Sequence, residues 1–185
     1  MFSASMQKVL GLVIAQPERS FTLNELLKHA GGGRGHLQSK IDQLVSIGVL
    51  EEGPRSARQR CIRVNKGFLL YPELRSMALK SFALAEPLRA ALKPFEHDIT
   101  EAFVFGSVAK ATDTHLSDID LIVVGQAPFM PLTSALYDLE TKLGRSVHLN
   151  LYAPEEWAHL QVTDPVLIQI ASSAKIEILP HATAN

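Results

Sequence analysis

Residues 102–110 read AFVFGSVAK, and residues 117–125 read SDIDLIVVG. The first stretch is an apolar run that ends at a Gly-Ser pair, and the second opens with Asp118 and Asp120 before it becomes apolar. Short apolar runs bounded by turn residues are typical of buried strands. The two stretches therefore predict a strand, a tight turn with a short helical segment, and a second strand that begins with two carboxylates.

The spacing of the two aspartates suits a hard cation. Side chains at positions i and i+2 of a strand point to the same face, so Asp118 and Asp120 can hold one ion together. Mg²⁺ prefers one or two carboxylates together with phosphate oxygens. On the preceding turn, Gly106 allows close backbone approach, Ser107 offers a hydroxyl and an amide at a helix N-terminus, and Lys110 follows one turn later. The pattern predicts a site for a Mg-nucleoside triphosphate, attacked at the α-phosphate with release of pyrophosphate.

The stretch FGSVAKATDTHLSDIDLIVVG, residues 105–125, resembles the core of the minimal nucleotidyltransferases of the polymerase-β-like superfamily. The resemblance extends over about residues 95–180. It implies transfer of a nucleoside monophosphate to a protein or small-molecule hydroxyl, with ATP as the expected nucleotide and Mg²⁺ as one or two ions. By this resemblance, Gly106 and Ser107 bind the triphosphate, and Asp118 and Asp120 bind the metal. Members of this branch often occur in toxin–antitoxin-like pairs, so a small helical partner protein is a further expectation.

The sequence departs from this family pattern at two places. Ala111 stands where the family usually has glycine, and active members carry a third carboxylate on a later strand. The expected strand at residues 146–152 offers only His148 and Asn150 on one face, and His148 aligns with the missing carboxylate. We interpret His148 either as a catalytic base or softer metal ligand, or as an ordinary polar residue in a degenerate site. Two functions stay open: a nucleotidyltransferase, or a catalytically degenerate fold that acts only as a nucleotide sensor or scaffold in a transcriptional regulator.

The remaining C-terminal sequence predicts helices that alternate with strands. The expected elements are helices at 131–143, from Pro154 and from Pro165, and a last strand at 175–179. Together with the first two strands they indicate a small mixed sheet with flanking helices. The fold class expected for the whole chain is α+β.

Charge divides the chain into two halves, although its formal net charge is only −1. Residues 1–80 carry an excess of six positive charges, and residues 81–185 carry an excess of seven negative charges. Chance scatter could give this balance, but it also fits two domains with different partners. The expected domains are residues 1–68, a connector at 69–94, and residues 95–185.

The basic half has the elements of a winged helix-turn-helix. Residues 6–15 predict a buried helix, and Thr22 with Glu25 forms a capping-box pattern that opens a second helix. After a turn at residues 31–35, a third helix extends to about Ser46. Two β-like runs at 49–52 and 61–64 then predict a hairpin. The stretch AQPERSFTLNELLKHAGGGRGHLQSKIDQLVSIGVLEEG resembles metalloregulator-type winged-helix repressors, with a similarity that extends over residues 5–66.

The winged-helix interpretation predicts DNA binding by two sets of side chains. In this motif the third helix contacts base edges, and arginines in the hairpin contact phosphates. The base-contacting candidates are Arg34, His36, Gln38, Ser39 and Gln43; the phosphate-contacting candidates are Arg55, Arg58 and Arg60, with Arg63 just beyond. The alternative is a winged helix that only docks proteins or dimerises. Metal sensing is not expected, because Cys61 has no pattern of Cys or His partners and fits a buried thiol.

The connector and the lone cysteine add two further expectations. Residues 73–92 predict a long amphipathic helix that Pro87 kinks or splits, and related regulators dimerise through such a helix, so we expect a homodimer. A single cysteine excludes an internal disulfide and fits a reducing cytoplasm. No stretch of the sequence has the length and apolarity of a membrane span, so we expect no membrane partner.

Overall fold

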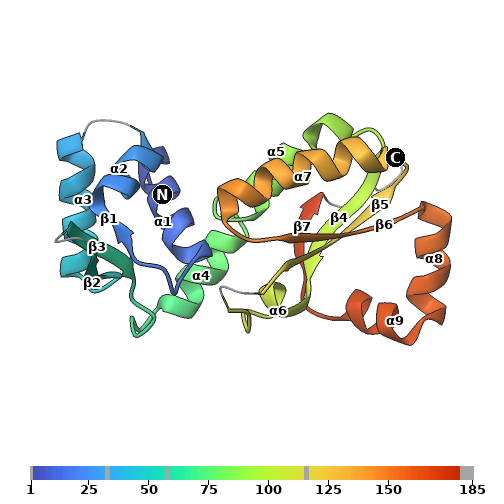
Figure 1. Cartoon of the computed structure of the whole chain (residues 1–185). Helices are drawn as coiled ribbons and strands as arrows, with labels where there is room; N and C mark the ends of the chain where they lie inside the picture. The colour runs from blue at the N-terminus through green and yellow to red at the C-terminus, as the bar shows by residue number, and fades with distance from the viewer. Residues whose placement is uncertain (1, 32–33, 57–58, 115–116, 180–185) are drawn as a thin grey trace. The chain divides into compact units, whose positions relative to one another are not determined.

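The computed structural model describes residues 2–31, 34–56, 59–114 and 117–179 (Figure 1). The chain divides into two compact units, Met1–Leu84 and Ala85–Asn185. Each unit has its own sheet, of three strands in the first and of four in the second, among the described residues. Within the described residues, no helix is both long and apolar enough to cross a bilayer.

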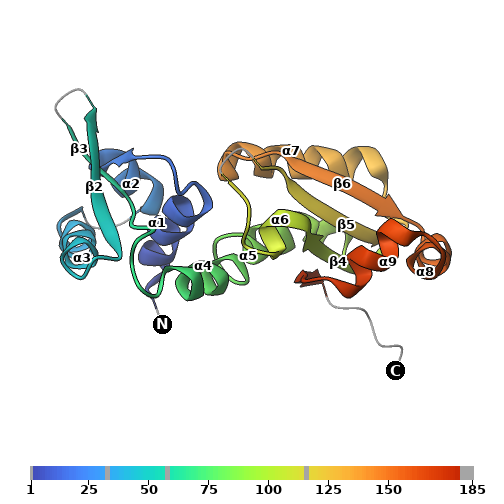
Figure 2. The same ribbon diagram turned by 90° about the horizontal axis from the view of Figure 1, so that it is seen from below.

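The N-terminal unit combines four helices with a three-stranded antiparallel sheet among its described residues. Its elements are α1 (Ala4–Ala15), β1 (Phe21–Thr22), α2 (Leu23–Ala30), α3 (Arg34–Ser46), β2 (Leu50–Ser56), β3 (Gln59–Val64) and α4 (Tyr71–Leu79). The strand order is β1-β3-β2, and Figure 2 shows β2 and β3 side by side as a hairpin. The helices and the hairpin expected from the sequence are therefore present, and β1 is an addition that the sequence analysis missed.

Local signals set the bounds of α2 and α3. The Thr22 hydroxyl accepts a hydrogen bond from the Glu25 amide at 3.2 Å, and the Glu25 carboxylate accepts one from the Thr22 amide at 2.6 Å. The predicted capping box is thus confirmed. The turn expected at residues 31–35 is shorter, because Arg34 and Gly35 already belong to α3; Gly32 and Gly33 lie outside the described residues. Cys61 is buried in β3, as expected.

The predicted long helix over residues 73–92 is in fact two helices. The helix α4 ends at Leu79, and α5 (Ala85–Leu92) begins after a turn at residues 80–84. Pro87 does not cause the break, because it lies in the first turn of α5, where its missing N–H removes no helical hydrogen bond. The boundary between the two units falls at the start of α5.

The C-terminal unit is built on a four-stranded mixed sheet. Its further elements are η1 (Lys93–Phe95), β4 (Ile99–Phe105), α6 (Gly106–Ala109), β5 (Ile119–Gly125), α7 (Phe129–Leu143), β6 (Val147–Tyr152), α8 (Pro154–Thr163), α9 (Pro165–Ser172) and β7 (Ile176–Leu179). The strand order is β6-β5-β4-β7, in which only β5 and β6 pair in parallel. The small mixed sheet and its flanking helices agree with the expectation.

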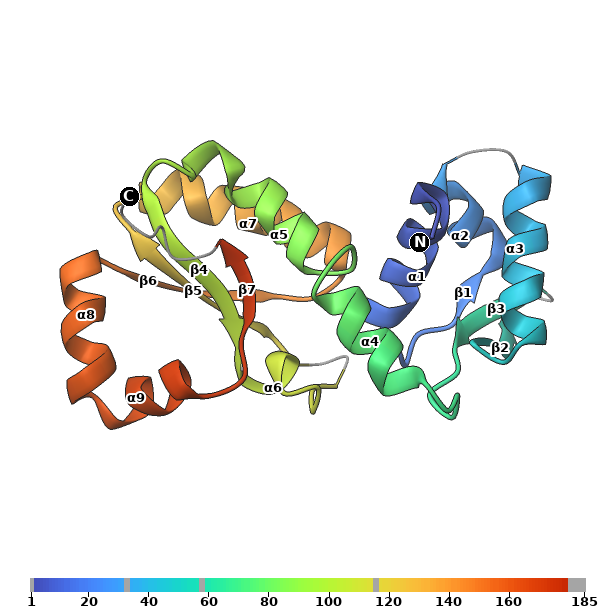
Figure 3. The same cartoon turned by 180° about the vertical axis from the view of Figure 1, so that it is seen from behind.

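Different helices pack on the two faces of this sheet. Figure 3 shows α5 and α7 side by side along one face, and these two helices are in contact. On the other face, Trp157 of α8 and Leu167 of α9 pack against Phe103, Ile122 and Val124. These side chains form a core on the face that also carries Asp120, because Asp120, Ile122 and Val124 alternate along β5.

Candidate functional site

The strand register brings the main site candidates to one row of the sheet. Phe105 at the end of β4 pairs with Asp120 of β5, and Asp120 pairs with His148 of β6. The next row contains Ile122 and Asn150. The predicted aspartate and the predicted histidine are therefore neighbours on adjacent strands. This follows from the pairing of residues that lie 28 positions apart in the sequence.

Gly106 fits closely against Asp120. Its φ is +72°, in the region that favours glycine, and a Cβ placed on it would lie 2.5 Å from Asp120 Oδ2. Any other residue at this position would strain the backbone and displace the carboxylate. The absence of a side chain at Gly106 thus lets the turn after β4 pack directly against the Asp120 carboxylate.

The carboxylates and the histidine are accessible. The Asp120 side chain is 31% exposed and the His148 side chain is 69% exposed, with His148 Nδ1 at 3.7 Å from Asp120 Oδ1. Asp118 lies exposed, one residue before β5. Two carboxylates with open sides form a donor set that suits Mg²⁺, which completes its shell with water and phosphate oxygens. Among the described residues, no group of three or more His, Cys, Asp or Glu side chains is arranged to hold a metal.

The connection between β4 and β5 contains the short helical segment that the sequence predicts. The helix α6 has only four residues, so its dipole is small and anion binding there depends on individual N–H groups. Lys110 is exposed at the end of this helix, and the Ser107 carbonyl accepts a hydrogen bond from the Thr112 amide at 3.0 Å. Ala111 has a φ of +58°, the left-handed conformation that glycine adopts without strain.

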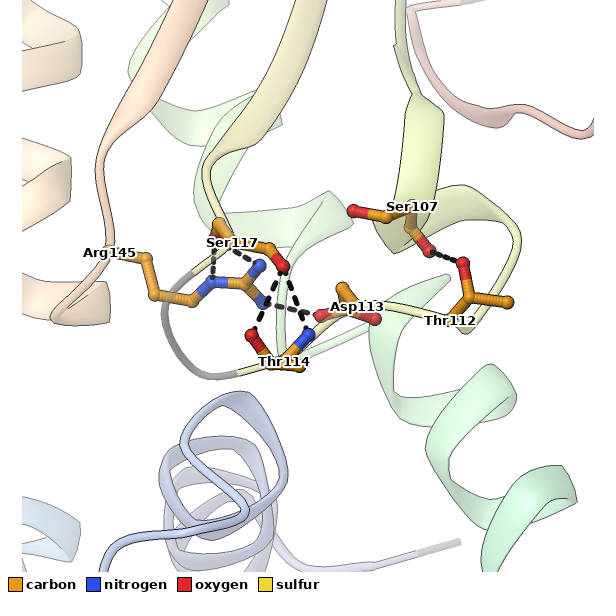
Figure 4. Close-up of polar contacts among 6 residues, drawn as sticks. All are labelled: Ser107, Thr112, Asp113, Thr114, Ser117 and Arg145. Carbon is orange, nitrogen blue, oxygen red and sulfur yellow. Dashed lines mark hydrogen bonds and ion pairs between the residues drawn. The ribbon is translucent and has the colours of Figure 1, made fainter.

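A buried arginine that could not be identified from the sequence contacts Asp113 and Ser117, which lie between α6 and β5 (Figure 4). Arg145 Nη1 pairs with Asp113 Oδ2 at 2.9 Å, and their side chains are only 3% and 1% exposed. Arg145 also donates to the Ser117 carbonyl from Nε at 3.0 Å. The pair joins residues 32 positions apart, and Arg145 lies far outside the stretch of residues 105–125 that contains Asp113. The only sequence signal is the position of Arg145 directly after Gly144, which ends α7.

Aromatic side chains line the same face beyond the site. Trp157 lies 5.9 Å from Phe103 and 5.5 Å from Tyr152, measured between ring centroids. Burial raises the pKa of Tyr152, and the negative charges of Glu156 and Asp164 act in the same direction. Lys175 Nζ lies 4.6 Å from the centroid of the Phe103 ring, a cation–π contact that the sequence analysis missed.

A mixed sheet with a glycine turn packed against a strand-borne aspartate is the arrangement expected of a nucleotidyltransferase. The model of the family described as "Polymerase beta, Nucleotidyltransferase" matches residues 87–179, which is half of the chain. The chain therefore belongs to this family. The resemblance noted from residues 105–125 is confirmed at the level of the family.

Two solved structures are similar to part of this chain. One is the crystal structure of a toxin–antitoxin with AMP-PNP, with 17% identity and a TM-score of 0.38, covering 52% of this chain and 73% of that one. The other is assigned as a nucleotidyltransferase from Sulfolobus solfataricus, with 16% identity and a TM-score of 0.29, covering 45% of this chain and 79% of that one. A comparison with curated proteins found no match.

The base-contacting candidates of the N-terminal unit lie on α3. His36, Gln38, Ser39 and Gln43 are exposed there. Leu37, Ile41 and Leu44 of the same helix are buried. The helix thus presents a polar face to solvent, as the helical spacing predicts. The side chains of Arg34 and Arg55, and the whole of Arg58, lie outside the described residues.

The remaining hairpin arginines are engaged in ion pairs. Arg60 pairs with Asp42 of α3 and with Glu52 of β2, the latter at 2.8 Å. The hydrogen bond to Asp42 is the largest influence that raises the pKa of Arg60. Arg63 pairs with Glu51 at 2.6 Å. A phosphate would have to compete with these carboxylates for Arg60 and Arg63.

Proposed function

We propose that the C-terminal unit binds a Mg-nucleoside triphosphate and transfers the nucleoside monophosphate to a protein or small-molecule hydroxyl. The observation that carries this proposal is the close fit of Gly106 against Asp120, with a φ of +72° and 2.5 Å between a notional Cβ and Asp120 Oδ2. A turn without a side chain beside a carboxylate leaves room for a phosphate and a metal ion together. Membership of the nucleotidyltransferase family supports the same reaction.

Each candidate residue has a distinct role in this proposal. Asp118 and Asp120 hold Mg²⁺, which neutralises charge on the phosphate oxygens when bound. The backbone at Gly106 and Ser107 binds the triphosphate, and exposed Lys110 adds a positive charge beside it. ATP is the proposed nucleotide, and a nucleotidyltransferase generally uses an NTP with Mg²⁺.

His148 is the proposed base. His148 Nδ1 lies 3.7 Å from Asp120 Oδ1 and its side chain is 69% exposed, so a neutral imidazole there is within reach of an attacking hydroxyl and can accept its proton. The test compares His148→Ala with His148→Asp. Loss of transfer in His148→Ala, with nucleotide binding retained, supports a base. Full transfer in His148→Ala contradicts this role, and a gain in His148→Asp identifies a site weakened by its missing carboxylate.

A second candidate function is nucleotide sensing without transfer. It is favoured by the observation that the described residues contain no metal-holding group of three His, Cys, Asp or Glu side chains. In this case Asp118 and Asp120 bind Mg-NTP, and the bound nucleotide acts on the rest of the chain. The two candidates share binding and differ in turnover.

One experiment separates these functions. The full chain is incubated with NTPs labelled at the α-phosphate, with and without a cell lysate as the source of acceptors. Asp118→Ala/Asp120→Ala is the inactive variant, and Asp138→Ala, an exposed acid on α7, is its matched control. Transfer is supported if the wild type and Asp138→Ala give labelled product and Asp118→Ala/Asp120→Ala does not. Calorimetric binding of Mg-ATP without product supports sensing, and absence of binding by any NTP contradicts both.

We also propose that the N-terminal unit is a winged helix that binds DNA. The order of α1, α2, α3 and the β2–β3 hairpin, together with the polar exposed face of α3, supports this proposal. Gln38→Ala/Gln43→Ala should weaken binding to a selected duplex and leave nonspecific binding unchanged. Arg58→Ala should weaken binding to all duplexes and reduce its salt dependence. Two results would contradict DNA binding: selection from a random pool that enriches no duplex, and a DNA affinity that does not depend on salt concentration. The unit would then be a protein-docking module.

A homodimer through the connector is a further proposal. Leu69, Leu70 and Met77 are 87%, 55% and 49% exposed, which supports an apolar contact at α4. Light scattering of the full chain at micromolar concentration should give a dimer mass, and Leu70→Glu/Met77→Glu should give a monomer. A monomeric wild type contradicts this proposal.

A small helical protein partner is proposed for the C-terminal unit. The exposed apolar side chains of Phe129, Met130 and Tyr137 on α7 support it. One of the two solved structures similar to part of this chain is that of a toxin–antitoxin. Purification from the source cells should give a complex for the wild type that Tyr137→Glu disrupts, and purification of both as free chains contradicts it.

A further inference from the structure

We propose that Arg145 is a positioning residue, which holds Asp113 and the Ser117 carbonyl in place so that Asp118 and Asp120 can share one metal ion. This inference rests on the proposed nucleotide-binding function. It assigns to the site a residue that touches neither the nucleotide nor the metal and that lies outside the GSVAK and SDIDL segments.

The first observation is the burial of the contact. Arg145 and Asp113 are 3% and 1% exposed, and their ion pair is 2.9 Å long. Arg145 directs two more nitrogens to the Ser117 carbonyl, Nε at 3.0 Å and Nη2 at 2.5 Å. The guanidinium thus binds the loop at two places with a fixed planar geometry.

The contacts of Arg145 lie next to the residues of the proposed site. Ser117 directly precedes Asp118, so the carbonyl that Arg145 binds belongs to the peptide group that leads into this aspartate. At the other end, the Thr112 amide binds the Ser107 carbonyl, and Asp113 is the next residue. Figure 4 shows the Thr112 hydroxyl in contact with the Ser107 carbonyl, and Arg145 in contact with both Asp113 and Ser117.

The buried Arg145–Asp113 ion pair is not needed for its contribution to the stability of the fold. Buried ion pairs add little net stability, because the charges lose their hydration, and apolar residues of similar volume often replace them without loss. The main effect of Arg145 is therefore to fix the positions of the groups that it binds. A conventional core contact could fill the same space but could not hold the Ser117 carbonyl. Groups that orient metal ligands from outside the ligand set typically contribute about 10- to 100-fold to metal affinity.

The test uses a variant designed to remain folded. Arg145→Met/Asp113→Leu removes both charges together, so that neither is left buried without a partner. Arg145→Lys keeps the charge and loses the planar fork. The matched control is Arg89→Met, because Arg89 also donates to a backbone carbonyl, that of Ile178 at 3.0 Å, but from α5. Fluorescence of Trp157 verifies folding, and calorimetry measures ATP binding with Mg²⁺ and with EDTA.

We expect Arg145→Met/Asp113→Leu to fold with a Tm near that of the wild type. Its affinity for ATP in Mg²⁺ should fall by about 10- to 100-fold, and its affinity in EDTA should change less than about twofold. Arg145→Lys should lose part of the Mg²⁺-dependent affinity, and Arg89→Met should lose none. A merely structural role would lower Tm or both affinities together.

Different outcomes overturn the two proposals. A wild type that binds Mg-ATP and a folded double variant that binds it equally well overturn the role of Arg145 alone. A parallel fall of affinity in Mg²⁺ and in EDTA also overturns it, because the metal site is then not what changed. A wild type that binds no NTP overturns the proposed function, and the role of Arg145 falls with it.

Discussion

Arg60 in the N-terminal unit and Arg145 in the C-terminal unit both pair with carboxylates, but in different surroundings. The Arg60 side chain is 32% exposed, and its partners Asp42 and Glu52 are 46% and 54% exposed. The side chains of Arg145 and Asp113 are almost completely buried. Water competes with the first contact and is excluded from the second. The same chemical pair therefore acts as a replaceable surface contact in one unit and as a fixed part of the structure in the other.

Exposed ion pairs of this kind also affect how the excess of positive charge in residues 1–80 is interpreted. Of the six acidic residues in positions 1–80, five form ion pairs with nearby cations. The pairs are Arg19–Glu25, Arg60–Asp42, Arg60–Glu52, Arg63–Glu51 and Lys66–Glu18. The positive excess of this half is real, but two of the four hairpin arginines share their charge with carboxylates of the same unit. A count of charges in the sequence does not show which of them face a partner.

The largest expected effect tests this comparison directly. Asp113→Ala leaves the Arg145 guanidinium buried without its partner and should cost about 3–5 kcal/mol of stability. Asp42→Ala, at the exposed pair, should cost less than about 1 kcal/mol. Urea unfolding measures both: Trp157, the chain's single tryptophan, reports the C-terminal unit, and far-UV circular dichroism reports the whole chain. Equal losses would contradict the distinction between the two pairs.

A smaller loss of stability is expected when either of two glycines with positive φ, one in each unit, is replaced by alanine. Gly106→Ala and Gly48→Ala each place an L-residue in a left-handed conformation, at a cost of about 1–2 kcal/mol. A Cβ at position 48 would lie 4.0 Å from Asn65 Nδ2, an ordinary contact, whereas at Gly106 it would collide with Asp120. Gly106→Ala should therefore also abolish Mg-ATP binding in calorimetry, and Gly48→Ala should leave it unchanged. Retained binding in Gly106→Ala would contradict the proposed phosphate turn.

Much of the fold could be predicted because its signals are local. The Thr22–Glu25 capping box, the Gly144 helix end and the Asp164 N-cap each involve residues within a few positions of one another. These contacts depend on the backbone nearby and not on the rest of the molecule. The break at residues 80–84 was misplaced for a related reason. Pro87 looked like a helix breaker, but its effect depends on where the helix begins.

The candidate site could be predicted only in part. Gly106 and Asp120 belong to a recognisable motif, and the structure explains their spacing by direct contact. The Arg145–Asp113 pair could not be predicted, because it depends on how β6 lies beside β5 and joins residues 32 positions apart. The same limit applies to Arg60, whose partner Asp42 is 18 positions away. Sequence patterns identify residue types, whereas long-range pairing decides their surroundings.

A modest gain in stability is expected at Ala111. Unlike Gly48 and Gly144, this left-handed residue carries a Cβ, with a φ of +58°. Ala111→Gly should relieve about 1–2 kcal/mol of strain and lose about 0.5–1 kcal/mol to the greater freedom of the unfolded chain, for a net gain of up to about 1.5 kcal/mol. Ala109→Gly, inside α6, is the control and should destabilise. Urea unfolding followed by Trp157 fluorescence measures both, and a loss in Ala111→Gly would show that the left-handed alanine is not strained.

The smallest effect concerns the acid stability of the N-terminal unit. Hydrogen bonds from the Thr22 amide and hydroxyl, with the charge of Arg19, hold the pKa of Glu25 below its ordinary value of 4.5. A carboxylate whose pKa is lower in the folded state adds stability above its unfolded pKa and loses it as the pH falls through the folded pKa. Because Glu25 is 47% exposed, the contribution should be below about 1 kcal/mol. The protection factors of the α2 amides, which compare each exchange rate with the intrinsic rate at the same pH, should therefore fall below about pH 4.5 in the wild type, and less steeply in Glu25→Gln, which keeps an acceptor but does not titrate. Parallel pH profiles of the two proteins would mean that the capping box stabilises α2 through its geometry and not through the charge of Glu25.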